Sequence, residues 1–201
     1  WYTEDYLDKK RNTERPAMFL RLFMNKWVTS HEEFIPIEWW DRASKAYEGP
    51  VTVWDAHPFY NHPLVLAVDA GVKRDSTAVV GVGYDGMRGK VGVACSYVWM
   101  PSKNSPIALD ATVRQTILDL SKRFKVVSVR YDPTHLLQLM LQLKDLGINT
   151  KEFSQTDTLM TNASQLLYDL LRSGNLEAYP DDTLRRHIQM IPDVQSPAHM
   201  A

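Results

Sequence analysis

Hydrophobic residues along most of the chain occur either in short runs typical of β-strands or at the spacing typical of helices. The strand-like runs come first. Residues 64–68 form a wholly apolar run that ends in Asp69, and two further runs, residues 78–84 and 90–100, flank the turn at residues 85–89. Short apolar runs joined by a Gly-containing turn are typical of a hairpin. We therefore expect three consecutive antiparallel strands in this part of the chain.

After the third run, the apolar residues recur at helical spacing, and helical and strand-like segments then alternate. Asp132 and Pro133 combine a helix N-cap with a proline at the first helical position, and Gly147 is a typical helix stop. The predicted elements are, in order, a helix over residues 107–124, a strand over 126–131, a helix from Asp132 to Gly147, a strand over 150–153, a helix that ends at Gly174 and a helix over 181–190.

Three strands followed by helix, strand, helix, strand and helix is an order that resembles the ribonuclease H-like fold. The expected fold class is α/β, with a mixed sheet of three antiparallel strands followed by parallel strands and flanked by helices. In that topology the first and fourth strands are parallel neighbours. Asp69 and Asp132 each end one of these strands, so we expect the two carboxylates to face each other at the sheet edge.

Residues 1–62 differ from the rest of the chain in composition and in hydrophobic pattern. They contain five of the six tryptophans, with charges interleaved among them, and they show no strand alternation. Aromatic residues recur at helical spacing over residues 16–28 and 36–47. Breakers at residues 61–63 then precede the first strand. We expect a helical linker or appendage over residues 1–62 and the ribonuclease H-like domain over residues 63–201.

Composition narrows the classes of protein that fit. The net charge of -1 weighs against a stand-alone, tight nucleic-acid binder, because such domains usually carry a basic excess. The single cysteine, Cys95, lies in an apolar stretch, so we expect a buried small hydrophobe rather than a disulfide or zinc ligand. No apolar run reaches the ~18–20 residues that span a bilayer. We expect a soluble, non-secreted protein, and a first residue of Trp suggests a piece of a longer one.

Two carboxylates are the strongest candidates for chemistry. Asp69 follows five apolar residues on an expected central strand, where an unpaired carboxylate would suffer desolvation unless a metal ion binds it. The alternative is that its side chain caps the turn at residues 70–71. Asp132 has its own alternative, because helix capping explains an Asp-Pro pair without any function. Asp75, in the turn after the first strand, is either a third ligand or a polar turn residue.

The pair is more informative than either acid alone. Two-metal hydrolysis of a phosphodiester needs carboxylates that converge on cations ~3.5–4 Å apart. Oxygen ligands suit Mg²⁺ or Mn²⁺, and we expect two ions. The sequence contains no G-x-S-x-G, no H-E-x-x-H and no G-x-x-x-x-G-K-[ST], which leaves serine hydrolases, zinc proteases and P-loop motors without support.

These motifs and their order resemble the C-terminal part of the large terminase subunit, the DNA-packaging motor and nuclease of tailed bacteriophages. The resemblance rests on residues 19–28, 66–71 with 75–78, 129–133, 155–156, the helix near Leu159 and residues 171–176. It implies a metal-dependent endonuclease that cuts concatemeric double-stranded DNA in the host cytoplasm. It also implies an ATPase domain on the preceding part of the protein, and the small terminase subunit and the portal or procapsid as partners.

The same family usually carries a third acid near the start of its last helix. In this chain Ser196 and Pro197 could open that helix, and Ala198 stands where an acid is expected. Three explanations stay open: a substitution of the acid at Ala198, an acid elsewhere (Asp193, or Asp181 and Asp182), or a segment missing from the printed sequence.

The sequence also offers candidate residues for DNA binding and allows two alternative functions. Local basic pairs, Lys73 with Arg74 and Arg185 with Arg186, are the DNA-binding candidates. Little sequence preference is expected, because such a site contacts phosphates rather than base edges. One rival is a fragment of an actin-like or sugar-kinase-like phosphotransferase, although such proteins duplicate the domain and no second copy is visible. The other rival is a non-catalytic docking module.

Overall fold

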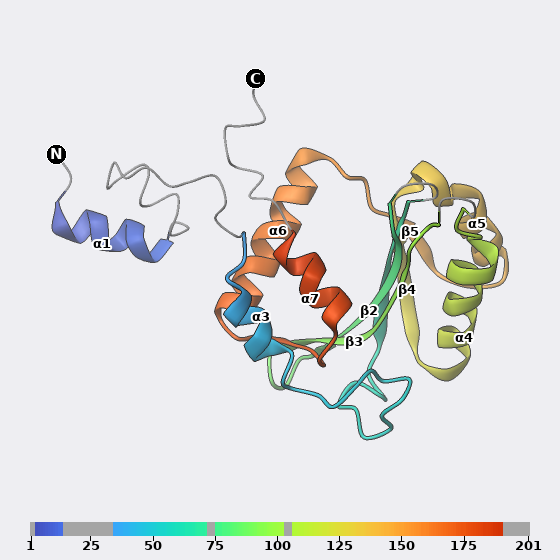
Figure 1. Cartoon of the computed structure of the whole chain (residues 1–201), viewed down its shortest axis with the longest axis horizontal. Coiled ribbons are helices and arrows are strands. Elements are labelled where there is room, and N and C mark those ends of the chain that lie inside the picture. The colour runs from blue at the N-terminus through green and yellow to red at the C-terminus, as the bar shows by residue number, and fades with distance from the viewer. Residues whose placement is uncertain (1–2, 14–33, 72–74, 103–105, 191–201) are drawn as a thin grey trace.

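A computed structural model describes residues 3–13, 34–71, 75–102 and 106–190 of the chain, and its centre is a six-stranded mixed sheet (Figure 1). The strand order is β5-β4-β1-β2-β3-β6. The strands are β1 (Leu64–Ala70), β2 (Thr77–Asp85), β3 (Lys90–Trp99), β4 (Val126–Tyr131), β5 (Thr150–Glu152) and β6 (Leu176–Glu177). Strands β1, β2 and β3 pair antiparallel, whereas β4 and β5 add in parallel on the side of β1. The predicted α/β fold is confirmed.

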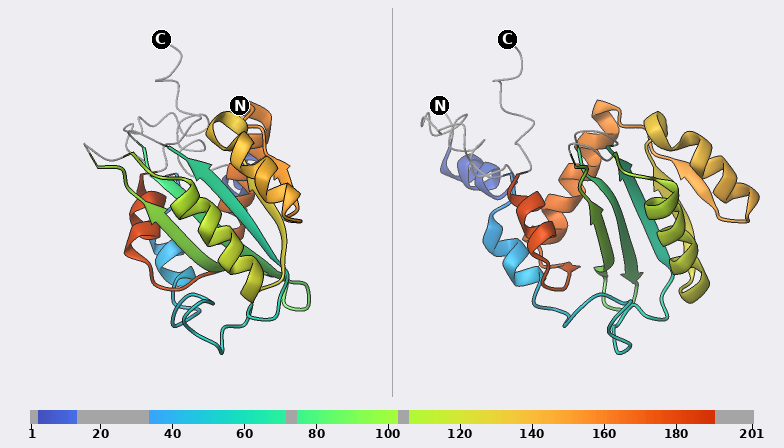
Figure 2. Two further views of the ribbon diagram at one scale, coloured as in Figure 1. Left: turned by 90° about the vertical axis from the view of Figure 1, so that its right-hand side faces the viewer. Right: turned by 45° about the vertical axis from the view of Figure 1, so that its right-hand side comes forward.

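Helices lie on both sides of this sheet (Figures 1 and 2). Helices α4 and α5 lie on one side, and α3, α6 and α7 lie on the other. The helices are α1 (Glu4–Thr13), α3 (Ile37–Ala43), a π-helical turn (Asp110–Arg114) that continues into α4 (Gln115–Arg123), α5 (Pro133–Asp145), α6 (Asp157–Arg172) and α7 (Asp182–Gln189). Neither α1 nor β6 is among the elements predicted from the sequence. Strand β6 has only two residues and pairs in parallel with Val91 and Gly92.

Local capping residues fix the ends of the helices as predicted. Asp132 is the N-cap of α5, and its side chain accepts a hydrogen bond from the Thr134 amide at 2.8 Å. Gly147 and Gly174, which follow α5 and α6, have φ angles of 87° and 71°. Residues with a side chain rarely adopt this left-handed conformation, so glycine there ends the helix at little cost.

Part of the segment expected to be an appendage packs into the main core. Ile35 and Phe59 are fully buried and belong to the same hydrophobic cluster as the sheet. The ring of Phe59 occupies the space that a side chain at Gly83 or Gly92 would need. The expected helix over residues 36–47 is shorter, as α3, and the one over residues 16–28 lies outside the described residues. The division at residue 62 stays a prediction.

Two smaller expectations concern Cys95 and membranes. Cys95 is fully buried, and burial raises the pKa of its thiol to about 11, as befits a residue that packs rather than reacts. Within the described part of the chain, no helix has the length and apolar character needed to cross a membrane.

Candidate functional site

The two candidate carboxylates lie at the carboxyl ends of neighbouring parallel strands. Val68 of β1 pairs with Tyr131 of β4, so the next residues in register are Asp69 and Asp132. Strand β1 continues through Asp69 to Ala70, whereas β4 ends at Tyr131. The topology that was expected from the order of the elements therefore brings these two acids together at one end of the sheet.

Alternation along β1 decides which side of the sheet carries Asp69. Val68, Val79 and Tyr97 form one row across three strands, and Tyr97 lines a pocket together with α4. Cross-strand partners share a face and successive residues alternate. Val68 therefore faces α4 and α5, and Asp69 faces the other side. We call the α4 and α5 side the closed face, and the opposite side, with Ala67 and Asp69 of β1, the open face.

The exposure of Asp69 corrects one premise of the sequence interpretation. Its side chain is exposed, so it is not a desolvated acid on a buried strand. The reason is that only alternate residues of β1 are covered by helices. Among the described residues, the Asp69 side chain forms no hydrogen bond or ion pair, although its backbone pairs with Ala78 of β2. The following turn is held by the Thr77 hydroxyl, which donates to the Gly71 carbonyl at 2.9 Å. Turn capping by Asp69 is thus not seen in this part of the chain.

Asp132 is both a helix cap and an anion. Hydrogen bonds from the side chain and from the backbone amide of Thr134 hold the pKa of Asp132 below its usual value, and the nearby His135 lowers it further. The carboxylate is therefore ionised at neutral pH. A carboxylate has about four acceptor positions, so a capping bond leaves room for a cation. Capping and metal binding at Asp132 are compatible.

Asp75 lies near the same end of the sheet. It is exposed in the turn between β1 and β2, and it packs against Gly71 so closely that a side chain at residue 71 would collide with it. Gly71 thus permits the tight return of the chain towards β2, which places Thr77 beside Ala70. A polar turn residue accounts for this position, and a ligand role for Asp75 stays a prediction.

The remaining candidates divide into those outside and those inside the described residues. Outside lie Lys73, Arg74, Asp193 and Ala198. Inside, Asp181 is the N-cap of α7 and accepts hydrogen bonds from the Thr183 and Leu184 amides at 2.8 and 3.0 Å. No group of three or more His, Cys, Asp or Glu side chains within the described ranges could hold a metal ion. The described part of the site is therefore a pair of carboxylates.

Arg185 has a structural contact that the sequence did not predict. Its Nε and Nη2 atoms donate to the two carboxylate oxygens of Asp41 at 2.7 and 3.0 Å, which ties α7 to α3. The same hydrogen bond lowers the pKa of Asp41. Arg186 is exposed on α7. DNA binding by these two arginines stays a prediction.

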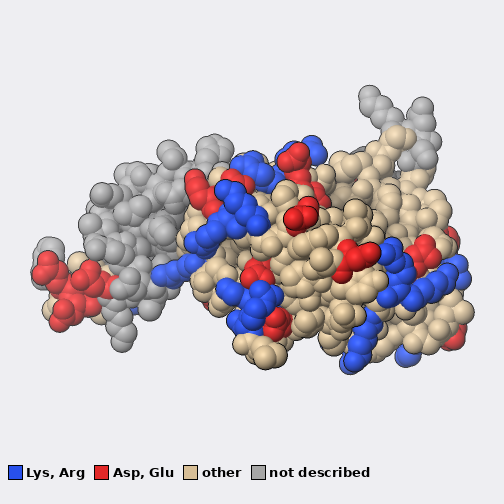
Figure 3. All heavy atoms as spheres, turned by 90° about the horizontal axis from the view of Figure 1, so that it is seen from below, with Lys and Arg blue, Asp and Glu red and all other residues tan. Residues whose placement is uncertain are grey.

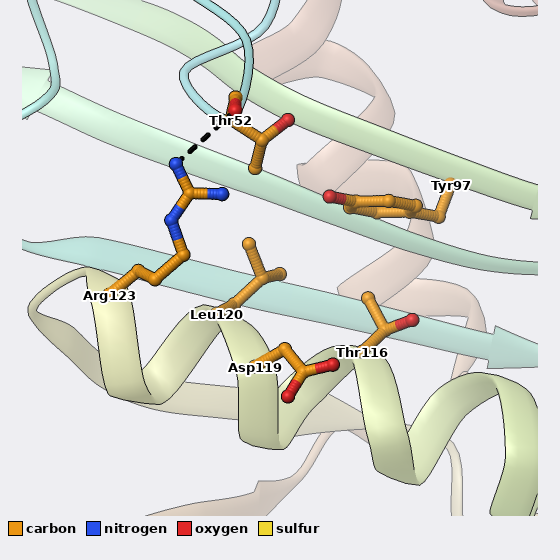
Figure 4. Close-up of a pocket in the computed structure, with 6 residues that line it drawn as sticks. All are labelled: Thr52, Tyr97, Thr116, Asp119, Leu120 and Arg123. Atoms are coloured by element: carbon orange, nitrogen blue, oxygen red, sulfur yellow. Dashed lines mark hydrogen bonds between the residues drawn. The ribbon is translucent and has the colours of Figure 1, made fainter. Parts of the chain in front are cut away.

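One pocket of about 120 Å³ lies on the closed face, between β3 and α4. Its lining residues are Thr52, Tyr97, Thr116, Asp119, Leu120 and Arg123. Figure 4 shows Thr116 and Leu120 extending from α4 towards the sheet, while Arg123 donates to the Thr52 carbonyl at 3.3 Å. Neither Asp69 nor Asp132 lines this pocket, so it is separate from the carboxylate pair.

Charges of both signs are mixed on the lower face of the molecule. Seen from below, Lys and Arg side chains are interspersed with Asp and Glu over much of the described surface (Figure 3). No continuous basic patch covers the part of this face that is described. This agrees with the net charge of -1, which indicates that any contact with nucleic acid is local.

Comparison with known proteins identifies the fold. No protein-family model matches the chain, and no curated protein matches it either. The HK97 bacteriophage large terminase has a similar structure, with 17% sequence identity and a TM-score of 0.61 over 92% of this chain and 43% of its own. The large terminase from a thermophilic bacteriophage, in complex with ADP, has 13% sequence identity and a TM-score of 0.63 over 96% of this chain and 46% of its own.

A nuclease domain alone is also similar. The large terminase nuclease from thermophilic phage G20c with bound magnesium has 18% sequence identity and a TM-score of 0.50 over 65% of each chain. Identities this low establish the fold and no more. The chain has the fold of the aligned region of these phage terminases, a ribonuclease H-like fold as expected. It spans less than half the length of the HK97 terminase and of the ADP-bound terminase.

Proposed function

We propose that this chain is the nuclease region of a phage DNA-packaging terminase, and that it is a divalent-metal-dependent endonuclease acting on double-stranded DNA. The proposal rests on one observation above all, the adjacent positions of Asp69 and Asp132 at the ends of parallel strands. Two independent caps would not need to meet at one end of the sheet. Metal-dependent hydrolysis of a phosphodiester needs carboxylates that are close enough to bind the same metal ions.

The donor set fits Mg²⁺ or Mn²⁺. Protein sites for Mg²⁺ commonly supply one or two carboxylates, and waters and substrate phosphates complete the coordination. Asp69 is exposed and Asp132 is kept ionised by Thr134. The G20c terminase nuclease binds magnesium in one structure and zinc in another. This supports a divalent cation at Asp69 and Asp132, and we propose two.

Each part of the chain then has a defined task in cleavage. Divalent cations at this site would supply an activated water and stabilise the leaving 3′ oxygen. Asp69 and Asp132 would hold and orient the cations, and the closed face of β1 would keep the two carboxylates in place. A site that meets phosphates rather than base edges gives little sequence preference. A third acid would complete the ligand set, and Asp193, or Asp181 and Asp182, are the candidates in this chain.

The same proposal extends to the whole protein. The HK97 terminase and the ADP-bound terminase are each more than twice as long as the aligned region. We propose that this chain likewise works beside a terminase ATPase domain, and that its substrate is concatemeric viral DNA brought by the small terminase subunit to the portal of a procapsid.

Plasmid cleavage tests the proposal directly. Supercoiled plasmid is incubated with the chain and Mn²⁺, and nicked and linear products are quantified on a gel. Asp69→Asn should lower the cleavage rate by about 1,000-fold, which is about 4 kcal/mol of activation free energy. The matched control is Asp145→Asn, an exposed acid at the end of α5, which should cut at the wild-type rate.

Three results would redirect the assignment. Undiminished cleavage by Asp69→Asn would remove Asp69 from the site. ATP binding by the chain would favour the phosphotransferase alternative. Calorimetry that detects no Mn²⁺ binding to the wild-type chain would favour the docking module.

A further inference from the structure

Two positively charged side chains, Arg130 and Lys151, are neighbours on the open face, near the carboxylates. Ala67 of β1 pairs with Arg130 of β4, and Arg130 pairs with Lys151 of β5. All three side chains are exposed. Since residues two apart on a strand share a face, Ala67 lies on the same face as Asp69, about 6.6 Å along the strand.

The sheet itself does not explain this pair of cations. Within the described residues, neither Arg130 nor Lys151 forms an ion pair or a side-chain hydrogen bond. Like charges directly across two strands repel each other and destabilise the sheet. The nearest acid on β5, Glu152, is in register with Tyr131 and so lies on the closed face. A bound anion between Arg130 and Lys151 would relieve the repulsion.

We infer that Arg130 and Lys151 bind a phosphate of the DNA strand whose cleavage is proposed for Asp69 and Asp132, an inference that rests on that proposed function. A guanidinium matches a phosphate with two parallel hydrogen bonds, and an adjacent ammonium adds a second charge. The short side chain of Ala67 leaves the sheet surface beside them accessible. Because Ala67 and Asp69 are only about 6.6 Å apart along β1, this phosphate would lie close to the cleaved one on the same DNA strand.

Arg130 and Lys151 do not form a run of basic residues in the sequence. They are far apart in the chain and meet only through the pairing of β4 with β5. Strand alternation combined with the parallel register was the pattern that could have identified them. Arg130 and Lys151 are positioning residues, since they would hold the substrate without touching the reacting atoms.

DNA binding without cleavage is the first test. Anisotropy of a labelled duplex is measured in EDTA at several salt concentrations, with the wild type and the double variant Arg130→Gln/Lys151→Gln. The variant should bind about tenfold more weakly, and the slope of log K against log salt should fall by about 0.9 for one lost phosphate contact. The control is Lys125→Gln/Lys144→Gln, which removes the same charge at the opposite end of the sheet.

Kinetics and stability separate this inference from the function on which it rests. The double variant should raise the KM for plasmid cleavage about tenfold and leave kcat within twofold, and its melting temperature should not fall, because a repulsion is removed. A wild-type enzyme that cuts DNA, with a double variant of unchanged salt slope, would overturn the phosphate site alone. A wild-type chain that binds DNA through these cations but never cuts it would overturn the proposed nuclease alone. No binding by the wild type at low salt would overturn the phosphate site.

Discussion

The closed and open faces of β1 differ sharply, although their residues alternate along a single strand. Leu64, Leu66 and Val68 on the closed face are at most 5% exposed, whereas Ala67 and Asp69 on the open face are exposed. The closed face fixes the backbone through packing, and the open face presents side chains to solvent. We therefore expect substitutions on the closed face to change the free energy of unfolding, and substitutions on the open face to change DNA cleavage or binding.

The largest effect on stability is expected on the closed face, for Leu66→Ala. Leu66 is fully buried, and truncation of a buried leucine removes burial and leaves a cavity, at a cost of about 2–5 kcal/mol. Urea unfolding measures the change. The matched control is Ala67→Ser on the open face, which should stay within about 0.5 kcal/mol of wild type. Equal losses at the two positions would contradict the division into two faces.

A smaller effect is expected at Asp132, where the two roles can be separated. Asn is a good N-cap but carries no charge, whereas Ala neither caps the helix nor carries a charge. The free energy of unfolding of Asp132→Ala should therefore be about 1 kcal/mol lower than that of Asp132→Asn. Both variants should lose plasmid cleavage in Mn²⁺, because both lose the proposed metal ligand. Cleavage by Asp132→Asn at the wild-type rate would leave capping as the sole role of Asp132.

The ion pair of α3 with α7 is expected to contribute less. The Asp41 and Arg185 side chains are 39% and 40% exposed, and exposed ion pairs contribute little to stability because water and salt screen them. Asp41→Asn and Arg185→Gln should therefore lower the free energy of unfolding by similar small amounts. Duplex binding then distinguishes the partners: only Arg185→Gln should weaken it if Arg185 also contacts DNA. Equal binding by both variants would assign Arg185 to structure alone.

The smallest effect concerns pH. Thr134 lowers the pKa of Asp132 in the folded protein, and unfolding restores the ordinary value of about 3.9. The stabilisation is complete above that value and is lost as the pH falls through the folded pKa. Acidification from about pH 5 to about pH 3 should thus destabilise the wild type more than Asp132→Asn. Parallel stability curves for the two proteins would argue against this hydrogen bond.

The elements themselves could be predicted from the sequence because their determinants are local. Apolar runs gave β1, β2, β3 and β4, and the Asp132 cap with Gly147 bounded α5. The order of these elements was enough to place β1 beside β4, and hence Asp69 beside Asp132. Strand β6 escaped because two residues carry no periodicity.

Only the tertiary structure decided what surrounds the two acids. Asp69 looked buried in an apolar run, but helices cover just one face of its strand, so it is exposed. Phe59 joins the core through Gly83 and Gly92. Arg185 meets Asp41 across 144 residues of sequence. Capping and periodicity act between residues a few positions apart and can be read from the chain, whereas exposure and long-range pairing depend on which elements pack together.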